Sequence, residues 1–194
     1  MPVPGELRFR TAGPGDAPAV AALHADSWQR HYRGAFADAF LDHEAPAFLL
    51  DRWTGRLAAP GPGDRTILAE LDQGQAGQAE LVGLAHTVLD DDPAWGALLD
   101  NLHVRYGVKR HGVGTRLLSL TAEAVLAGRP GSGLYLWVLE QNASARAFYD
   151  ARGGACVEGR EVMPPGGDPA RLNGTPGCLR YAWPDPGKLL AARP

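Results

Sequence analysis

The sequence is short of cysteine and contains no long run of apolar residues. Its 194 residues include only two cysteines, Cys156 and Cys178, which are too few for a disulfide framework and whose spacing fits no zinc pattern. No apolar stretch approaches the ~18 residues of a membrane-spanning helix. Residues 1–10 lack the apolar segment of a signal peptide. We therefore expect a cytoplasmic protein that carries reduced thiols and does not attach to a membrane.

Positive charge is also too scarce for a general nucleic-acid-binding protein. Lys and Arg number 19 against 22 Asp and Glu, which gives a formal net charge of −3. A nucleic-acid-binding domain usually carries a broad basic excess, so we expect no nucleic-acid partner. The six histidines are scattered, and no third ligand accompanies the pair His24 and His31, so we expect no metal site. The length suits a single domain over residues 1–194.

Glycine and proline, by contrast, are abundant, and they divide the chain into segments. The 25 glycines and 16 prolines gather at 13–18, 59–63, 128–133, 164–177 and 184–187, and such clusters mark turns and loops. Apolar runs between them predict strands at 7–12, 66–71, 79–89, 97–104, 134–139, 155–163 and 178–183. Helices are predicted after Asp16, which is expected to cap the first of them, within 35–57 with a break at Pro46, over 113–127, and after the cap residue Asn142. The order predicts a mixed α/β domain, with 164–178 and 184–194 as loop or flexible segments; the first is either a lid or disordered.

One glycine pair stands apart because of its surroundings. Gly112 and Gly114 follow a strand and open a helix, and Arg105 and the basic residues 109–111 crowd the same connection. A helix N-terminus has unpaired N–H groups and a partial positive charge, and glycine lets the backbone approach a ligand closely. Together these features predict an anion site suited to phosphate, with a tight turn and incidental surface charge as the alternative. Neither a Walker loop nor a dinucleotide fingerprint fits the spacing.

The spacing Lys109-x-x-Gly112-x-Gly114 resembles the Arg/Gln-x-x-Gly-x-Gly/Ala signature of the GNAT N-acetyltransferases. A second segment of that family has a strand, an Asn, a short helix with a Tyr, and a Gly turn. Residues 134–154 match it, with Asn142, Ala145, Tyr149 and Gly153 at the family's positions. The resemblance covers 95–160 well and 7–30 weakly. Lys109 departs from the pattern, since it keeps a positive charge but lacks the planar fork of donors of Arg.

The resemblance implies an α/β (α+β) GNAT fold, with a central, twisted, mostly antiparallel sheet and helices on both faces. It also implies acetyl-CoA as the cofactor. The pyrophosphate would lie on the loop amides, and the pantetheine arm would run between strands 97–104 and 134–139, which splay apart at their C-terminal ends. The cofactor-binding residues implied in this way are Leu102, His103, Val104, Lys109, Arg110, His111, Gly112, Val113, Gly114, Thr115, Asn142, Ala145 and Tyr149.

The reaction implied is direct attack of a primary amine on the thioester within a ternary complex, with a backbone N–H near Val104 polarising the carbonyl. Tyr149 is expected to protonate the departing thiolate. Asp100 is the first candidate for the base, because strand alternation places it on the face of Leu102 and Val104, an unusual place for a carboxylate. An ordinary, solvated Asp100 is the alternative. Three histidines are weaker candidates for the base: His103, His86 and His24.

The site that binds the acceptor amine is the part of the active site that the sequence predicts least well. Trp28, Tyr32 and His86 are expected to bind the substrate, a small-molecule or peptide amine, with core packing as the alternative for the aromatic pair. The acidic run 90–92 either attracts a cationic amine or is a solvated turn. The competing function is a non-catalytic acyl-CoA-binding or sensor domain with the same fold, which would not need Tyr149. Assembly as a homodimer is left open.

Overall fold

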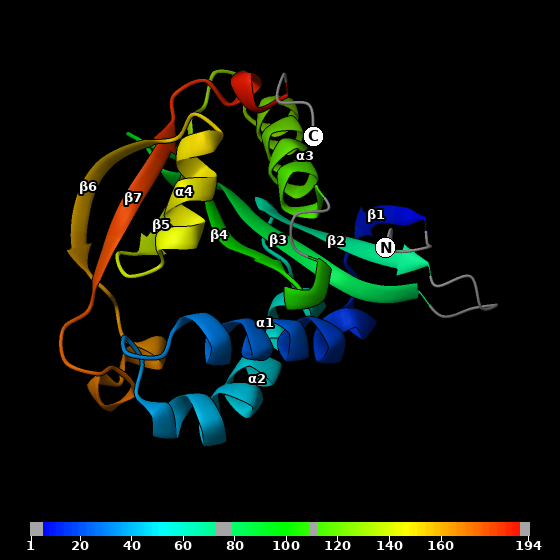
Figure 1. The fold of residues 1–194 in the computed structure, drawn as a ribbon. Coiled ribbons are helices and arrows are strands. Elements are labelled where there is room, and N and C mark those ends of the chain that lie inside the picture. The colour runs from blue at the N-terminus through cyan, green and yellow to red at the C-terminus, as the bar shows by residue number, and fades with distance from the viewer. Residues whose placement is uncertain (1–5, 73–78, 109–111, 191–194) are drawn as a thin grey trace.

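The protein is built around a twisted seven-stranded sheet (Figure 1). The computed structural model describes residues 6–72, 79–108 and 112–190. The strands are β1 (Leu7–Thr11), β2 (Asp64–Asp72), β3 (Ala79–Asp92), β4 (Gly96–Val104), β5 (Leu134–Leu139), β6 (Ala155–Glu161) and β7 (Gly177–Trp183). They lie in the order β1-β2-β3-β4-β5-β7-β6, and neighbours are antiparallel except for the parallel pair β4 and β5. This arrangement confirms the predicted mixed α/β class and the mostly antiparallel sheet.

Helices cover both faces of the sheet, as predicted. The α-helices are α1 (Ala17–His31), α2 (Ala45–Ala58), α3 (Val113–Gly128) and α4 (Ala143–Ala151). Helices α1 and α2 lie on one face, and α3 and α4 lie on the other (Figure 1). Short 3-10 turns occur at Pro14–Asp16, Tyr106–Val108, Pro165–Gly167, Pro169–Arg171 and Pro186–Leu189. Within the described part of the chain, no helix is both long and apolar enough to cross a membrane.

The apolar core consists of a layer on each face of the sheet. On one side, Leu117 of α3 packs with Leu136 of β5 and the aromatic residues of β7. On the other side, Leu49 and Trp53 of α2 pack against Leu84 of β3, and all three are fully buried. Because each layer removes several large apolar side chains from water, both faces contribute to folding.

Two local predictions around the first helices need correction. Asp16 precedes α1 but does not cap it with its side chain, because its carboxylate accepts hydrogen bonds from Arg10 at 2.7 and 2.8 Å and from the Gly13 N–H at 2.7 Å. Pro46 does not break the helical region in two. A π-helical segment, Phe40–Glu44, runs directly into α2. The wider turn of that segment ends with the Ala45 N–H donating to the Phe40 carbonyl, and Pro46 follows in the first turn of α2.

The long connection between β6 and β7 packs against the connection between α1 and α2. The Ala37 N–H donates to the Arg171 carbonyl at 3.0 Å, and the Asn173 N–H donates to the Ala35 carbonyl at 2.8 Å. The guanidinium of Arg171 also lies 5.0 Å from the ring of Phe40. The segment is thereby tied to the α1–α2 connection at several points.

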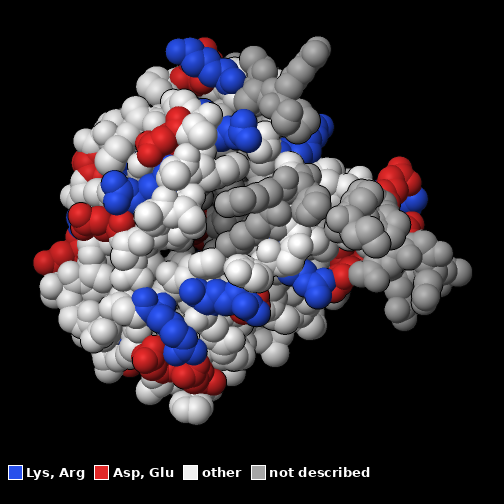
Figure 2. Space-filling model, viewed as in Figure 1, with Lys and Arg blue, Asp and Glu red and all other residues white. Residues whose placement is uncertain are grey.

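Charged residues of both signs are interspersed over the face of the molecule in Figure 2. Among the residues described on that face, no broad patch carries a single sign. The charges described on this face therefore give little indication of a ligand, and the candidate site is built from its cavity.

Candidate active site

The parallel strands β4 and β5 pair only at their beginnings. The ladder joins Ala97 to Leu134 and Leu98 to Tyr135, and no further pair follows in the described strands. Because β4 continues to Val104, its backbone N–H and C=O groups on this edge have no ladder partner across the gap. The predicted splay of the two strands is therefore confirmed.

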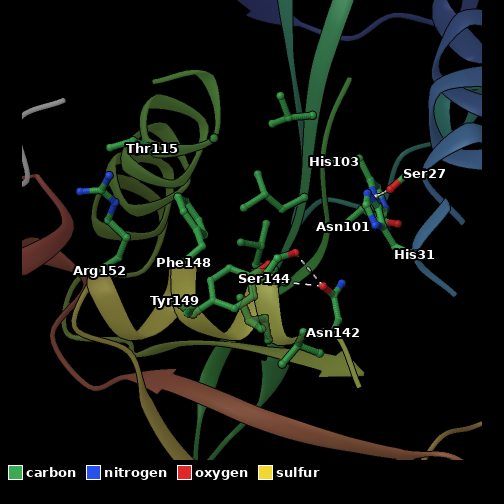
Figure 3. Close-up of a pocket in the computed structure, with 18 of the residues that line it drawn as sticks. Ser27, His31, Asn101, His103, Thr115, Asn142, Ser144, Phe148, Tyr149 and Arg152 are labelled. Atoms are coloured by element: carbon green, nitrogen blue, oxygen red, sulfur yellow. Dashed lines mark hydrogen bonds between the residues drawn. The ribbon is translucent and has the colours of Figure 1, made fainter. Parts of the chain in front are cut away.

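A cavity of about 1250 Å³ lies where β4 and β5 separate (Figure 3). Its walls come from the end of α1, the second half of β4, the N-terminus of α3, the middle of β5, and α4. Eleven of the predicted site residues line it, namely Tyr32, Asp100, Leu102, His103, Val104, Gly112, Gly114, Thr115, Asn142, Ala145 and Tyr149. The structure thus brings both ends of the predicted site to one connected space.

Other predicted site residues lie elsewhere. Val113 is buried in the core below α3. Trp28 does not line the cavity, because it packs against Tyr32 with ring centroids 5.6 Å apart. His86 is fully buried, and its Nδ1 lies 2.7 Å from the Thr66 hydroxyl. Three further predicted residues, Lys109, Arg110 and His111, lie outside the described residues.

The N-terminus of α3 opens onto the cavity through its two glycines. Gly112 has φ 78° and ψ −4°, a left-handed conformation that favours glycine. Its carbonyl accepts the first helical bond, from Arg116 at 2.9 Å, so the amides of residues 113–115 have no partner within the helix. A Cβ at Gly114 would lie 3.6 Å from Val104 and from Phe148, so this backbone forms the cavity wall between β4 and α4. These amides, with the positive end of the helix dipole, suit an anion.

Helix α4 begins at the edge of the cavity because Asn142 caps it. The Asn142 Oδ1 accepts hydrogen bonds from the Ala145 N–H at 3.2 Å and from the Ser144 hydroxyl at 3.1 Å. The spacing of Ala145 and Phe148 places them on one face of α4, and Arg152 follows at the C-cap of the helix; all three line the cavity. Phe148 and Arg152 were not predicted as site residues, although their helical spacing from Ala145 was a usable signal.

Tyr149 lines the cavity and also packs in the apolar core. It is only 8% exposed, and its ring centroid lies 5.8 Å from that of Tyr181 and 6.1 Å from that of Trp183. Burial raises the pKa of the Tyr149 phenol above its ordinary value, and the nearby Tyr32 phenol acts in the same direction. The hydroxyl therefore stays protonated at neutral pH, as a proton donor must.

Asp100 is the extra residue of a β-bulge, which corrects its predicted orientation. His86 pairs with Asn101 and Thr87 pairs with Leu99, so Asp100 has no partner on β3. The bulge shifts the alternation of β4. Asp100 consequently meets Arg56 of α2 at 2.9 Å, whereas the following residues Leu102 and Val104 pack on the α3 side. The prediction that all three share one face is therefore wrong.

A cluster of histidines lies between β4 and the helices α1 and α2. The His24 Nδ1 accepts a hydrogen bond from the Trp53 indole N–H at 3.0 Å, and burial lowers the pKa of His24 well below its ordinary value. The ring of His103 lies 4.2 Å from that of His24, centroid to centroid. The His103 Nδ1 lies 2.9 Å from the Ser27 hydroxyl. Ser27 lines the cavity but was not predicted, because its partner is 76 residues away in the sequence.

We expect the buried histidines to make the protein less stable at mildly acidic pH. Burial lowers the pKa of His86 to about 4 from 6.5, and the Arg56 charge acts in the same direction. Between these two values the unfolded chain binds more protons than the folded one, so the free energy of unfolding falls as the pH falls from about 6.5 toward 4. The loss for His86 alone approaches about 3 kcal/mol.

Urea unfolding at pH 7.5 and 5.5 measures the first part of this loss, at pH values above the ordinary pKa of Asp and Glu. The variant His86→Asn should show a smaller difference between the two pH values, because it removes one of the two imidazoles, His24 and His86, whose pKa is lowered by burial. Equal stability of the wild type at both pH values would contradict the expectation.

Comparison with known proteins agrees with this geometry. The sequence model described as the acetyltransferase (GNAT) family matches residues 20–154. A protein of Mycobacterium tuberculosis described as a "probable N-acetyltransferase" is 29% identical over 149 residues, which cover 77% of this chain and 80% of the relative.

Solved structures show the same fold. The PaiA N-acetyltransferase of Thermoplasma acidophilum in complex with coenzyme A superposes with a TM-score of 0.68 at 15% identity, over 92% of this chain and 99% of that one. An acetyltransferase of Thermus thermophilus superposes with a TM-score of 0.57 at 26% identity, over 91% and 96%. The family match spans well over half of the sequence and includes both glycine-loop and α4 segments. This chain belongs to the acetyltransferase (GNAT) family.

Proposed function

We propose that this protein transfers the acetyl group of acetyl-CoA to a primary amine of a small molecule or peptide, by direct attack within a ternary complex. The observation that carries the proposal is the continuous cavity between the diverging strands, which connects the α3 N-terminus to Tyr149. Membership of an acetyltransferase family supports acetyl transfer. Primary amines are the proposed acceptors because the curated relative is described as an N-acetyltransferase.

The residues at the cavity fit acetyl-CoA. The unpaired amides of residues 113–115 suit the pyrophosphate, and the lack of a side chain at Gly114 leaves this backbone open between Val104 and Phe148. The unpaired edge of β4 at Leu102 and Val104 offers backbone groups to the amides of the pantetheine arm. When bound, acetyl-CoA supplies an activated thioester. The backbone N–H near Val104 would polarise the carbonyl of that thioester.

Proton donation and binding of the acceptor amine are assigned to opposite sides of the cavity, Tyr149 and the residues near α1. Tyr149 keeps its proton at neutral pH and would give it to the departing thiolate. Tyr32 and Asn101 line the cavity on the side of α1, where they would hold the acceptor amine. Trp28 would act through Tyr32, because it stacks on that ring. Holding both reactants in line supplies a large part of the acceleration.

A thiol-release assay with acetyl-CoA tests the proposal. The panel should hold amines of different shape, such as cadaverine, spermidine, lysine amide, tyramine and a short peptide with a free N-terminus. We expect release of coenzyme A above the hydrolysis background with at least one of them. Release that is independent of every amine would contradict the proposal.

We also expect acetyl-CoA to stabilise the folded protein. A ligand that binds only the folded state adds about 2.7 kcal/mol to the free energy of unfolding at 100 times its Kd. Thermal melting with and without acetyl-CoA measures this effect. S-acetyl-N-acetylcysteamine, which carries the thioester without the nucleotide, is the matched control and should have little effect. An unchanged melting temperature at millimolar acetyl-CoA would contradict the proposal that the N-terminus of α3 binds the pyrophosphate of the cofactor.

A further inference from the structure

The described part of the cavity wall includes a histidine whose surroundings differ from those of the other buried histidines. His103 lies on β4, between Leu102 and Val104, and is 8% exposed. It lines the cavity from the side of α1, where Figure 3 draws it with Ser27, Asn101 and His31, away from Tyr149. Its backbone is held in the ladder with β3, where His103 pairs with Leu84, and a side chain on a strand is positioned more precisely than one on a loop.

Its neighbour His24 is unable to take up a proton without breaking a buried contact. The Trp53 indole N–H is a donor only, so the His24 Nδ1 that accepts it at 3.0 Å carries a lone pair. The proton of His24 is therefore on Nε2, and the ring is neutral. His86 is fully buried, with its Nδ1 2.7 Å from the Thr66 hydroxyl, and it does not line the cavity. Of these three histidines, His103 is the one placed to exchange a proton with a ligand.

Asp100 is less well placed for the same task. Its Oδ2 accepts the Asn101 side-chain N–H at 2.8 Å and the Arg56 guanidinium at 2.9 Å, and Arg52 lies 4.0 Å away. A proton arriving at this oxygen would have to displace N–H groups that already occupy it. The contacts of Asp100 fit a counter-ion that anchors α2 to the bulge of β4.

We propose that His103 is the base of the reaction, which takes the proton of the acceptor amine at its Nε2, directly or through one bridging water. This inference rests on the proposed function. It requires the tautomer in which the His103 Nδ1–H donates to the Ser27 hydroxyl, because only then does Nε2 carry a lone pair. The neutral ring of His24 lies 4.2 Å from the ring of His103, centroid to centroid, and adds no second positive charge beside the imidazolium that forms.

The reaction requires one proton acceptor and one proton donor, and these are His103 and Tyr149 on opposite sides of the cavity. The amine nitrogen forms a bond to the acetyl carbon, and the carbon–sulfur bond breaks with its electron pair on sulfur. The His103 Nε2 receives the proton lost by the nitrogen, and the thiolate takes the proton of the Tyr149 hydroxyl. Solvent then removes the proton from His103 and restores that of Tyr149, so the site is ready for another turnover.

The tautomer of His103 is measurable without turnover. In ¹⁵N-labelled protein, the ring nitrogen shifts distinguish a protonated Nδ1 from a protonated Nε2, and loss of the signals in His103→Asn assigns them. We expect His103 to carry its proton on Nδ1 and His24 to carry its proton on Nε2 at neutral pH. Finding the His103 proton on Nε2, with Nδ1 accepting from Ser27, would overturn the proposal.

Chemical rescue then tests the role in turnover. The variant His103→Ala should lower kcat about 10²-fold, the low end for a positioned base, with the most active amine of the panel as the acceptor. Added imidazole should restore a large part of kcat, whereas 1,2,4-triazole, a ring of the same size but much weaker as a base, should not. Equal rescue by both rings, or by neither, would show that the histidine fills space and would overturn the proposal.

Two further variants serve as controls. His103→Asn keeps a side-chain N–H for Ser27 and replaces the alanine variant if that variant does not fold; it should lose kcat to a similar extent.

His31, the last residue of α1, also lines the cavity and is the alternative candidate for the base. If His31→Ala loses turnover and responds to imidazole while His103→Ala stays active, the proposal is wrong. A wild type that acetylates no amine would instead overturn the proposed function, and the tautomer measurement stands apart from that result.

Discussion

Replacing Tyr149 by phenylalanine is expected to lower kcat about 10²-fold, while the melting temperature and the affinity for acetyl-CoA barely change. The hydroxyl is the only group removed, and the ring keeps its contacts with Tyr181 and Trp183. Because burial raises the pKa of Tyr149, its hydroxyl is protonated at neutral pH and is available as a donor to the departing sulfur. Steady-state kinetics with a saturating amine, together with thermal melting, measure the three quantities.

Tyr181→Phe is the matched control for this change. Tyr181 is 2% exposed and belongs to the same apolar cluster, but it does not line the cavity. Its loss of a hydroxyl should leave kcat unchanged. If Tyr149→Phe keeps its full kcat, another group or water delivers the proton. If it instead melts at a much lower temperature, the hydroxyl supports the core, and the proposed acid role fails.

Replacing Gly112 by valine is expected to weaken acetyl-CoA binding about 10²-fold or more. A branched side chain at φ 78° costs about 1–2 kcal/mol in backbone strain, and it stands where the α3 amides face the cavity. Misplacing two hydrogen bonds to a charged group loses about 3 kcal/mol of binding, which corresponds to the stated factor. Isothermal titration calorimetry with coenzyme A measures the change.

The chain offers a control for the strain alone. Gly131 has φ 83°, and a Cβ there would meet nothing within 4 Å. Gly131→Val therefore imposes similar strain far from the ligand, and it should lower stability without changing the Kd for coenzyme A. If both valine variants bind coenzyme A like the wild type, the glycine pair serves only as a turn.

The sequence predicted those parts of the site that depend on local signals. Strand 134–139 has the predicted bounds, since its apolar run is continuous, with Gly133 before it and Glu140 after it. Gly112 and Asn142 mark the beginnings of their helices through backbone conformation and capping, which are properties of a few consecutive residues. The splay of β4 and β5 came from the family resemblance, since no local pattern contains it.

The parts that the sequence did not predict depend on contacts between distant segments. The bulge at Asp100 is set by its register with β3, and one extra residue puts Asp100 on the face of the sheet opposite to that of Leu102 and Val104. The hydrogen bond from Trp53 to His24 joins α2 to α1 across 29 residues, and nothing in either segment alone indicates it. The same holds for the Ser27–His103 contact, on which the proposed base depends.

The most direct test of acetyl transfer follows the acetyl group itself. The wild-type protein is incubated with ¹³C-acetyl-CoA and the most active amine of the panel, and mass spectrometry measures the labelled amide and free coenzyme A over time. We predict that both form in equal amounts, and that Tyr149→Phe slows both alike. If the protein binds acetyl-CoA tightly but forms no labelled amide with any of the amines, acetyl transfer is contradicted. The protein would then be an acyl-CoA-binding domain.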